Sequence, residues 1–255
     1  AISKEKVKQN LSLPLNGNKL ISFDCIELIT RNSKKKIHIK KIKTLSKNIK
    51  NKVNLDLRNI TKKKKFNKLN FYNFPLLMGV LNVTPDSFSD GGKFLNNISA
   101  RKQIKKLINN GASIIDIGGE STRPGSNEVS FKKEWKRIKS KLNIMKKQRC
   151  LVSLDTRKTL IMKKSLPYNI SLINDVSGLN YDNNKLNFLK KYKIPFVLHH
   201  TQGKPNTMQL KPKYNNVILD IYDFFEKKLN LIKSNKIKHK NIILDPGIGF
   251  GKNLK

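Results

Sequence analysis

Short apolar runs that alternate with amphipathic helical stretches constrain the fold of residues 77–255 more than any other feature of the sequence. These runs are Leu77–Asn82, Ser113–Gly118, Cys150–Asp155, Ile170–Asp175, Pro195–His199 and Asn241–Asp245. Apolar residues at helical spacing between them predict helices near residues 98–110, 131–147, 157–166, 183–193 and 215–236. Strict alternation of strand and helix favours right-handed βαβ units around a parallel sheet. We therefore predict an α/β domain over residues 71–255.

Residues 1–70 differ from this pattern. They carry 20 basic and 4 acidic residues, and residues 62–65 are all lysine. Residues 19–30 are biased toward strand-forming apolar residues, and isoleucines recur among lysines between residues 37 and 42, so the sequence allows a small hairpin here. Residues 46–68 have the composition of a basic linker. We predict a basic N-terminal extension that ends in this linker.

The formal net charge of +37 suggests nucleic-acid binding, but its distribution argues against a specific site. The basic excess extends over the whole chain, and only 7 of the 54 basic residues are arginine. Arginine is preferred for bidentate recognition of phosphates and bases, so a specific nucleic-acid reader should contain more of it. We expect no specific nucleic-acid partner, although such a charge attracts polyanions nonspecifically.

The sequence contains no apolar run of about 18 or more residues and does not open with the apolar region of a signal peptide. Cys25 and Cys150 match neither a disulfide framework nor a zinc-binding spacing. We expect a cytoplasmic protein with reduced thiols and no membrane partner.

The first apolar run leads into a loop that is dense in hydrogen-bonding side chains. Bulky apolar residues between 77 and 83 predict a strand buried on both faces, and Pro85 cannot continue a strand ladder, so the strand should end near Asn82. Small polar residues follow up to residue 90, at the carboxyl end of the strand, where α/β folds bind ligands. An ordinary polar turn is the alternative.

Polar residues also follow every other run. They are Asp116 within the second run and Glu120 just after it, Asp155 at the end of the third, Asn174 and Asp175 at the end of the fourth, His199 at the end of the fifth with His200 after it, and Asp245 at the end of the sixth. One such carboxylate could simply cap the next helix. Because parallel strands bring their carboxyl ends to one face, the repeated pattern predicts a single site there.

Five motifs resemble those of the dihydropteroate synthase family of pterin-binding enzymes. They are MGVLNVTPDSFSDGG (78–92), DIGGESTRPGS (116–126), SLDT (153–156), INDVSG (173–178) and DPGIGFGK (245–252). The resemblance implies a (β/α)8 TIM barrel and a transferase of folate biosynthesis, which joins (7,8-dihydropterin-6-yl)methyl diphosphate to 4-aminobenzoate and releases diphosphate. It also implies Mg²⁺ as cofactor, inhibition by sulfonamides and a homodimer.

By this resemblance, Asp155, Asn174 and Asp245 contact the pterin ring. A pterin presents an amide and amino edge, for which carboxylates and carboxamides are natural partners. An anionic Asp155 would also stabilise the positive charge that develops on the ring as diphosphate leaves. Asn82 would hold Mg²⁺ and diphosphate, since Mg²⁺ prefers oxygen ligands and phosphate.

The other site residues implied by the resemblance are Asp116, His200, Asp86, Phe88, Thr122, Arg123 and Pro124. Asp86 is expected to act with Asp155 and Asn82 in catalysis. The loop that carries Asp86 and the loop at residues 122–124 would close over aminobenzoate and exclude water. Asp116 and His200 would complete the substrate-binding set.

The chain departs from the family pattern in two places. The fifth strand of the family usually ends in Met-His-Met, whereas residues 199–201 are His-His-Thr. Adjacent strand residues point to opposite faces, so only one of His199 and His200 should line the pocket, and we assign His200. The last two strands of the family carry a Ser-Arg-Lys and an Arg-X-His motif, which this sequence lacks. We therefore expect a barrel truncated after its sixth strand, from a longer natural protein.

Two other functional classes are considered. A pterin-dependent methyltransferase of the same barrel superfamily would share the contacts at Asp155 and Asn174, but it transfers methyl to a corrinoid and needs no diphosphate loop. The polar loops at residues 82–92 and 120–126 therefore favour the synthase. A noncatalytic basic binding protein is supported by charge alone.

Overall fold

The computed structural model describes residues 2–66, 69–70, 75–84, 96–121, 126–203, 212–237 and 241–252. The chain divides into two compact units. The first consists of Ala1–Lys65 with Asn70–Pro75, and the second of Phe66–Leu69 with Leu76–Lys255. Each unit is described separately below. None of the described helices is long and apolar enough to cross a membrane.

The first unit is built from short elements. Its helices are α1 (Ile2–Lys8), the 3-10 helix η1 (Ile39–Thr44) and α2 (Lys47–Thr61), and its strands are β1 (Leu13–Leu15), β2 (Asn18–Phe23), β3 (Cys25–Ile29) and β4 (Lys34–His38). Strands β1 and β2 pair antiparallel, as do β3 and β4, so the hairpin that the sequence allowed is present. Ile37, Ile42 and Val53 form its small buried core. The short strands β5 (Lys65–Phe66) and β6 (Leu69–Asn70) pair where the two units join in sequence.

The prediction of a linker over residues 46–68 is wrong for most of that segment, because α2 occupies residues 47–61. Apolar residues recur at 49, 53, 57 and 60, which is helical spacing, and Val53 is buried against the core of the first unit. The lysines lie between these positions and hide the stripe in a reading by composition. A helix can present charge on one side and bury the other.

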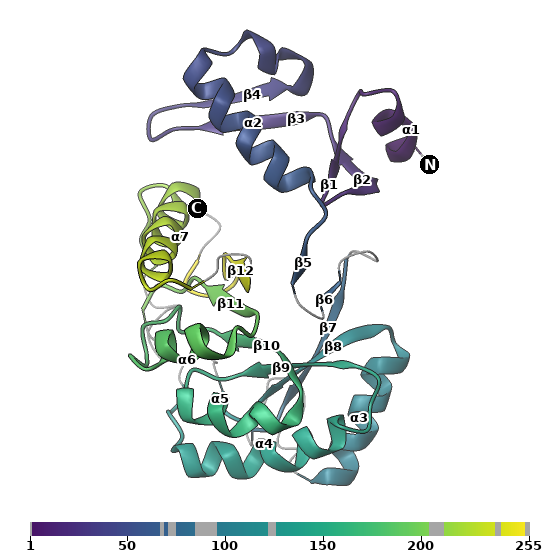
Figure 1. The fold of residues 1–255 in the computed structure, drawn as a ribbon, viewed down its shortest axis with the longest axis vertical. Coiled ribbons are helices and arrows are strands. Elements are labelled where there is room, and N and C mark those ends of the chain that lie inside the picture. The colour runs from purple at the N-terminus through teal and green to yellow at the C-terminus, as the bar shows by residue number, and fades with distance from the viewer. Residues whose placement is uncertain are drawn as a thin grey trace. The chain divides into compact units, whose positions relative to one another are not determined.

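The second unit is a six-stranded parallel sheet (Figure 1). Its strands are β7 (Leu77–Asn82), β8 (Ala112–Gly118), β9 (Leu151–Asp155), β10 (Ile170–Asp175), β11 (Phe196–His199) and β12 (Ile242–Asp245). They lie side by side in sequence order from β7 to β12, and every adjacent pair is parallel. This confirms the six predicted strands and the parallel sheet.

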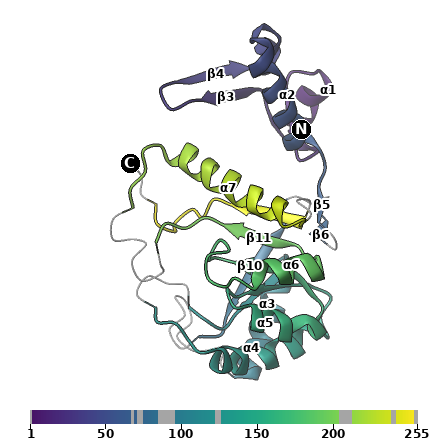
Figure 2. The ribbon, with the colours of Figure 1, turned by 60° about the vertical axis from the view of Figure 1, so that its left-hand side comes forward.

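Helices connect successive strands along the outer side of the sheet (Figures 1 and 2). They are α3 (Asn97–Asn109), α4 (Phe131–Met145), α5 (Thr159–Ser165) with η3 (Leu166–Tyr168), α6 (Lys185–Tyr192) and α7 (Val217–Ser234). Right-handed crossovers that always step one strand in the same direction place each helix on the same face. Helix α3 packs on β7 and β8, α4 packs on β8, and neighbouring helices pack on one another.

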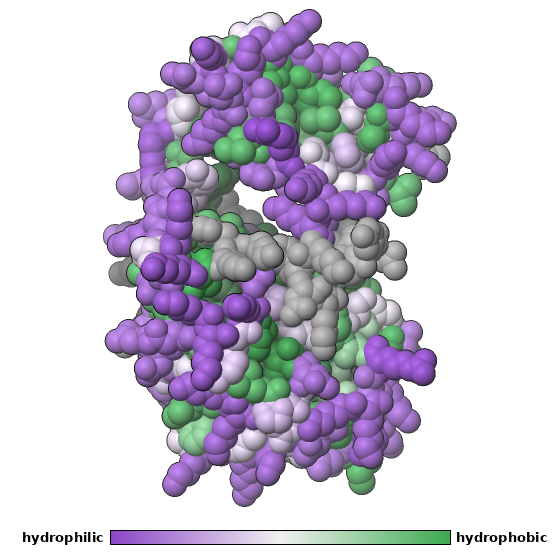
Figure 3. Space-filling view, in the orientation of Figure 1, coloured by the Kyte–Doolittle hydropathy of each residue, from purple (hydrophilic) through white to green (hydrophobic). Residues whose placement is uncertain are grey.

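The hydrophobic core lies between the sheet and these helices. Side chains that point outward from the strands are almost completely buried there: Leu81, Ile115, Ile117, Leu154, Ile173 and Leu198. The opposite, inner face carries the polar residues described below. On the face drawn in Figure 3, hydrophilic side chains cover most of the surface of both units, as expected for a basic excess spread along the chain.

Strand β7 departs from the sequence prediction on one point. We expected a strand buried on both faces, but Val80 is 52% exposed on the inner face, whereas its neighbour Leu81 is fully buried. Among the described residues β7 lies at the edge of the sheet, where β8 is the one strand that it pairs with, so fewer neighbours cover its inner face. The strand ends at Asn82, as predicted from Pro85.

Candidate functional site

The strand register places four of the polar strand ends in one row across the inner face. Asn82 of β7 lies opposite Gly118 of β8, Gly118 lies opposite Asp155 of β9, and Asp155 lies opposite Asn174 of β10. Asp116 lies two residues before Gly118 and therefore on the same face. The predicted convergence of the polar strand ends is thus present in β7 to β10.

Within this row, Asn174 is oriented by Asp116. Its Nδ2 donates a hydrogen bond to Asp116 Oδ2 at 2.9 Å. An ionised carboxylate only accepts hydrogen bonds, so this contact assigns the amide nitrogen to Asp116 and leaves the carbonyl oxygen of Asn174 for another donor. Asp116 is buried, and its Oδ1 has no hydrogen-bond partner among the described residues. A buried acceptor of this kind is costly unless a ligand satisfies it.

Gly118 provides the space for the Asp155 carboxylate. A Cβ atom at this position would lie 2.9 Å from Asp155 Oδ2, which is closer than such contacts occur. The Asp155 side chain therefore lies over the backbone of β8, toward Asn82. A side chain at position 118 would therefore force the Asp155 carboxylate to move.

The two acids of the row are held in an unfavourable electrostatic environment. Burial raises the pKa of Asp116. The pKa of Asp155 lies well above the usual range, first because of burial and then because of the nearby carboxylates of Asp116, Glu134, Asp175 and Glu120. No lysine or arginine nitrogen in the described part of the chain lies within ion-pair distance of either acid. A ligand that donates hydrogen bonds or carries positive charge would relieve this strain.

Asp245 and His199 extend the site toward β12. They are register partners, and His199 Nε2 lies 4.0 Å from Asp245 Oδ2. Asp245 is 46% exposed and accepts a hydrogen bond from the backbone N–H of Gly247 at 2.8 Å. The His199 ring is buried edge-on to Phe250, with its Nδ1 unpartnered among the described residues. Register places His199 on the inner face, because it follows Val197, the partner of Asn174, by two residues.

His200, the histidine that we assigned to the pocket, points elsewhere. Its ring packs edge-on against Phe224 of α7 at 4.8 Å, and its Nδ1 lies 3.1 Å from Lys252 Nζ. Burial, followed by the charge of Lys252, lowers the pKa of His200 to about 4, so its imidazole is neutral near pH 7. The structure therefore brings His199, and not His200, together with the acids of the inner face. Only one of the two adjacent histidines lies on the inner face, as the alternation rule predicted, but that residue is His199 and we had chosen His200.

The loop residues of the expected site, namely Asp86, Phe88, Thr122, Arg123 and Pro124, lie outside the described residues. Asn82 is described and is half-buried at the carboxyl end of β7. The described residues contain no group of three or more histidine, cysteine or acidic side chains that could hold a metal ion.

Comparison with known proteins shows which family the chain belongs to. Residues 78–255 match a family described as pterin binding enzyme. The dihydropteroate synthase of Haemophilus influenzae is 40% identical over 190 residues, which cover 74% of this chain and 69% of that protein. The chain belongs to the dihydropteroate synthase family.

Solved structures of dihydropteroate synthases agree with this fold. The Yersinia pestis enzyme in complex with a sulfonamide drug superimposes with a TM-score of 0.70 at 38% identity, covering 74% of this chain and 70% of that one. The Burkholderia cenocepacia enzyme complexed with 7,8-dihydropteroate gives 0.61 at 31% identity, covering 72% and 62%. The second unit therefore shares the TIM-barrel fold of these enzymes, with six of the barrel's strands, β7 to β12, among its described residues. The chain spans from 61% to 69% of the length of the curated dihydropteroate synthases that it matches.

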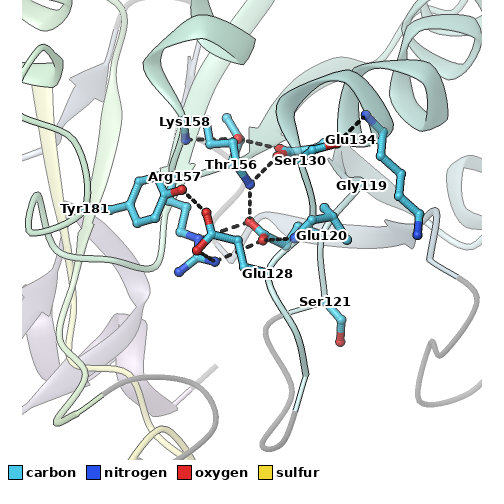
Figure 4. Close-up of polar contacts among 12 residues, drawn as sticks. Gly119, Glu120, Ser121, Glu128, Ser130, Glu134, Thr156, Arg157, Lys158 and Tyr181 are labelled. Carbon is cyan, nitrogen blue, oxygen red and sulfur yellow. Dashed lines mark hydrogen bonds and ion pairs between the residues drawn. The ribbon is translucent and has the colours of Figure 1, made fainter.

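A second group of buried charges in this dihydropteroate synthase family member joins residues that follow β8 and β9 to helix α4, and sequence reasoning missed it (Figure 4). Lys158 Nζ donates to Glu120 Oε2 at 2.7 Å and to Glu134 Oε2 at 2.8 Å. Glu134 also accepts a hydrogen bond from the hydroxyl of Thr156 at 2.6 Å and is fully buried. Arg157 completes the group, which we call the ion cluster: Glu120, Glu134, Arg157 and Lys158.

The pKa values of the two acids in the ion cluster shift in opposite directions. Burial opposes ionisation of Glu120, but hydrogen bonds from Arg157, Lys158 and the backbone of Val129 outweigh it and lower its pKa. Burial raises the pKa of Glu134, and the hydrogen bonds from Lys158 and Thr156 offset only part of that. Glu120 is therefore the firmly ionised member of the group.

A separate buried ion pair lies at the carboxyl end of β10. Lys185 of α6 and Asp175 are each 1% exposed, with Lys185 Nζ 2.5 Å from Asp175 Oδ2. Asp175 also accepts hydrogen bonds from the backbone N–H and the hydroxyl of Ser177. Asp175 points to the helix side, so it is a structural neighbour of Asn174 and not part of the row. The sequence showed that Asp175 lies beside Asn174 at the end of a strand. It did not show that Asp175 pairs with Lys185, which lies ten residues further along the chain.

Proposed function

We propose that the full-length protein is a dihydropteroate synthase, which condenses (7,8-dihydropterin-6-yl)methyl diphosphate with 4-aminobenzoate and releases diphosphate. The observation that carries this proposal is the row on the inner face, in which Asn174 bonds Asp116 and which also holds Asn82 and Asp155. Family membership favours the synthase over the methyltransferase and the basic binding protein.

The pterin ring is proposed to bind against Asp155, Asn174 and Asp245. The amide and amino groups of a pterin donate hydrogen bonds, which the carboxylates of Asp155 and Asp245 accept. Asn174 offers its carbonyl oxygen, because its nitrogen is engaged with Asp116. The donors of the ring would also compensate the unpaired charge of Asp155.

Asp155 is the proposed electrostatic catalyst. Positive charge develops on the ring and its methylene group as the bond to diphosphate breaks. A carboxylate that is already in place beside the ring stabilises that charge without reorganisation, and more strongly than in water because its surroundings are poorly hydrated. The amine nitrogen of aminobenzoate then attacks the methylene carbon and loses a proton.

The carboxamide oxygen of Asn82 is suited to Mg²⁺. Mg²⁺ often binds through one or two protein oxygens together with substrate phosphates and water, and the carboxamide of Asn82 supplies such an oxygen at the end of β7. When bound, the ion would neutralise charge on the leaving diphosphate. We place Asp86 and Phe88 of the first loop, and Thr122, Arg123 and Pro124 of the second, around the aminobenzoate.

The remaining expectations are part of the same proposal. The solved structure of the Yersinia pestis enzyme contains a sulfonamide drug, and that of a Xanthomonas albilineans enzyme contains 4-aminobenzoic acid. We expect sulfonamides to compete with aminobenzoate here as well. We also propose that the enzyme is cytoplasmic and acts as a homodimer.

Product formation by the full-length protein tests the function. The assay supplies the pterin diphosphate, 4-aminobenzoate and Mg²⁺, and measures dihydropteroate and released diphosphate. We expect equal amounts of the two products, dependence on both substrates and loss of activity on chelation of Mg²⁺. Diphosphate release without dihydropteroate, or no turnover at all, would contradict the proposal.

A further inference from the structure

The segment between β8 and α4 is closed at its base by side-chain contacts. Glu120 begins this segment, and its Oε1 accepts a hydrogen bond from the backbone N–H of Val129 at 3.0 Å. Inside that closure, the hydroxyl of Ser126 donates to the carbonyl of Ser121 at 2.7 Å. The carboxylate of Glu120 therefore joins the two stems of the segment 120–129.

Arg157 holds this closure from the neighbouring strand. Its Nε donates to Glu120 Oε2 at 3.0 Å and its Nη2 to Glu120 Oε1 at 2.9 Å, which is the two-point geometry that fixes both distance and orientation. Nη2 also lies 3.6 Å from Glu128 Oε2, near the second stem. One guanidinium group thus contacts both stems of the segment (Figure 4).

A third segment fixes the guanidinium group itself. Its central carbon lies 4.3 Å from the centre of the Tyr181 ring, which follows β10, and the Tyr181 hydroxyl donates to Glu128. Stacking on an aromatic face restrains an arginine that would otherwise be mobile. Arg157 is therefore the point where segments after β8, β9 and β10 meet.

Arg157 is also two residues from Asp155, so the described stems of the segment, residues 120–121 and 126–129, are positioned relative to the proposed catalytic carboxylate. Lys158 cannot replace it in this role, because its ammonium group contacts Glu120 and Glu134 but neither Glu128 nor the far stem. Lys158 does keep Glu120 paired if Arg157 is removed. Loss of Arg157 should therefore disturb the position of the segment more than the stability of the fold.

We propose that Arg157 is a positioning residue that sets these two stems against Asp155 and thereby determines affinity for the amine substrate. This inference rests on the proposed function. The pterin partners Asp155 and Asn174 lie on strands, whereas the second substrate must be met by groups beyond the strand ends. Displacement of the segment should weaken aminobenzoate binding and leave pterin binding unchanged.

The test compares Arg157→Gln and Arg157→Lys with wild type in the full-length protein. Arg101→Gln, an exposed arginine on α3, is the control. We expect both Arg157 variants to raise KM for aminobenzoate by about fivefold or more, since Lys keeps the charge but not the two-point contact. KM for the pterin diphosphate, and its affinity measured by calorimetry without aminobenzoate, should change by less than about twofold.

Several outcomes would overturn the inference. An unchanged KM for aminobenzoate in Arg157→Gln, or an equal rise in both KM values, would show that Arg157 only supports the fold. Full activity in Arg157→Lys would show that charge alone matters. Glu128→Gln, which alters the exposed end of the same contact, provides a milder variant if Arg157→Gln does not fold, and should raise the same KM by a smaller factor. Absence of turnover in wild type would instead contradict the proposed function.

Discussion

The inner row and the ion cluster both contain acidic side chains, and Asp116 of the row is only four residues from Glu120 of the cluster. The two sets differ in whether a cation lies beside the carboxylates. In the ion cluster, Glu120 and Glu134 share the ammonium group of Lys158, and Glu120 also binds Arg157. In the row, Asp116 and Asp155 have no such cation among the described residues, and their pKa values are raised. The contrast indicates that the ion pairs of the cluster stabilise the fold, whereas the carboxylates of the row are available to bind a ligand.

Removal of a cation from the ion cluster should give the largest effect. Lys158→Met leaves the buried carboxylates of Glu120 and Glu134 without their shared partner, and breaking a buried pair in this way costs about 3–5 kcal/mol. We expect a loss of this size in the free energy of unfolding, measured with denaturant. Lys163→Met, an exposed lysine on α5, is the control and should change it by less than about 0.5 kcal/mol. Equal free energies of unfolding for Lys158→Met and Lys163→Met would show that the ion cluster contributes no more to stability than an exposed lysine does.

Removal of the acid of the row should reduce turnover. Asp155→Asn deletes the anion beside the developing cation, and we expect kcat to fall at least about tenfold. Asp56→Asn, an exposed acid in the first unit, should leave kcat unchanged. Steady-state kinetics of the full-length protein would measure both. Wild-type kcat in Asp155→Asn would refute its catalytic role.

Loss of the oriented carboxamide should weaken pterin binding. Asn174→Ala removes an acceptor from the pterin and leaves Asp116 without its hydrogen bond, so we expect a loss of about 1–3 kcal/mol in pterin affinity. Calorimetric titration of the pterin diphosphate measures this directly. Asn143→Ala, an exposed position on α4, serves as the control. An unaltered affinity in Asn174→Ala would place the pterin elsewhere.

The two histidines should give the smallest and most discriminating difference. His199→Gln alters a side chain 4.0 Å from Asp245, whereas His200→Gln alters one packed against α7. We expect His199→Gln to weaken pterin binding by about two- to fivefold, roughly the strength of one hydrogen bond, and His200→Gln to change it by less. Because the pKa of His200 is about 4, His200→Gln should also leave the pH profile between 5 and 8 unchanged. The reverse order of effects would restore the assignment of His200 to the pocket.

Periodicity predicted the second unit well, because strands and helices there depend on local patterns. The end of β7 at Asn82 followed from Pro85, and the polar strand ends predicted the face that carries the site. The reading by composition failed for α2, where lysines concealed an apolar stripe around Val53. The apolar run of β7 gave a wrong prediction for its exposed inner side, because burial depends on which strands are neighbours.

Side-chain partnerships across the fold could not be predicted from the sequence. Lys158 and Glu120 are 38 residues apart, and nothing in either local pattern indicates that they meet. The choice between His199 and His200 likewise required the register of β11 with β10, which local sequence does not specify. Such contacts arise only when the sheet order and register are known.

Thermal unfolding of the unliganded protein as a function of pH tests the central contrast most directly. A raised pKa means that ionised Asp155 destabilises the native state above that pKa, and that protonation relieves the penalty as the pH falls toward the ordinary aspartate range. Asp155→Asn should therefore unfold at a higher temperature than wild type at pH 7, although it is less active, and this gain should shrink as the pH is lowered. A variant that is less stable than wild type at pH 7, or a gain that does not depend on pH, would show that Asp155 serves the fold and is not held in reserve for the ligand.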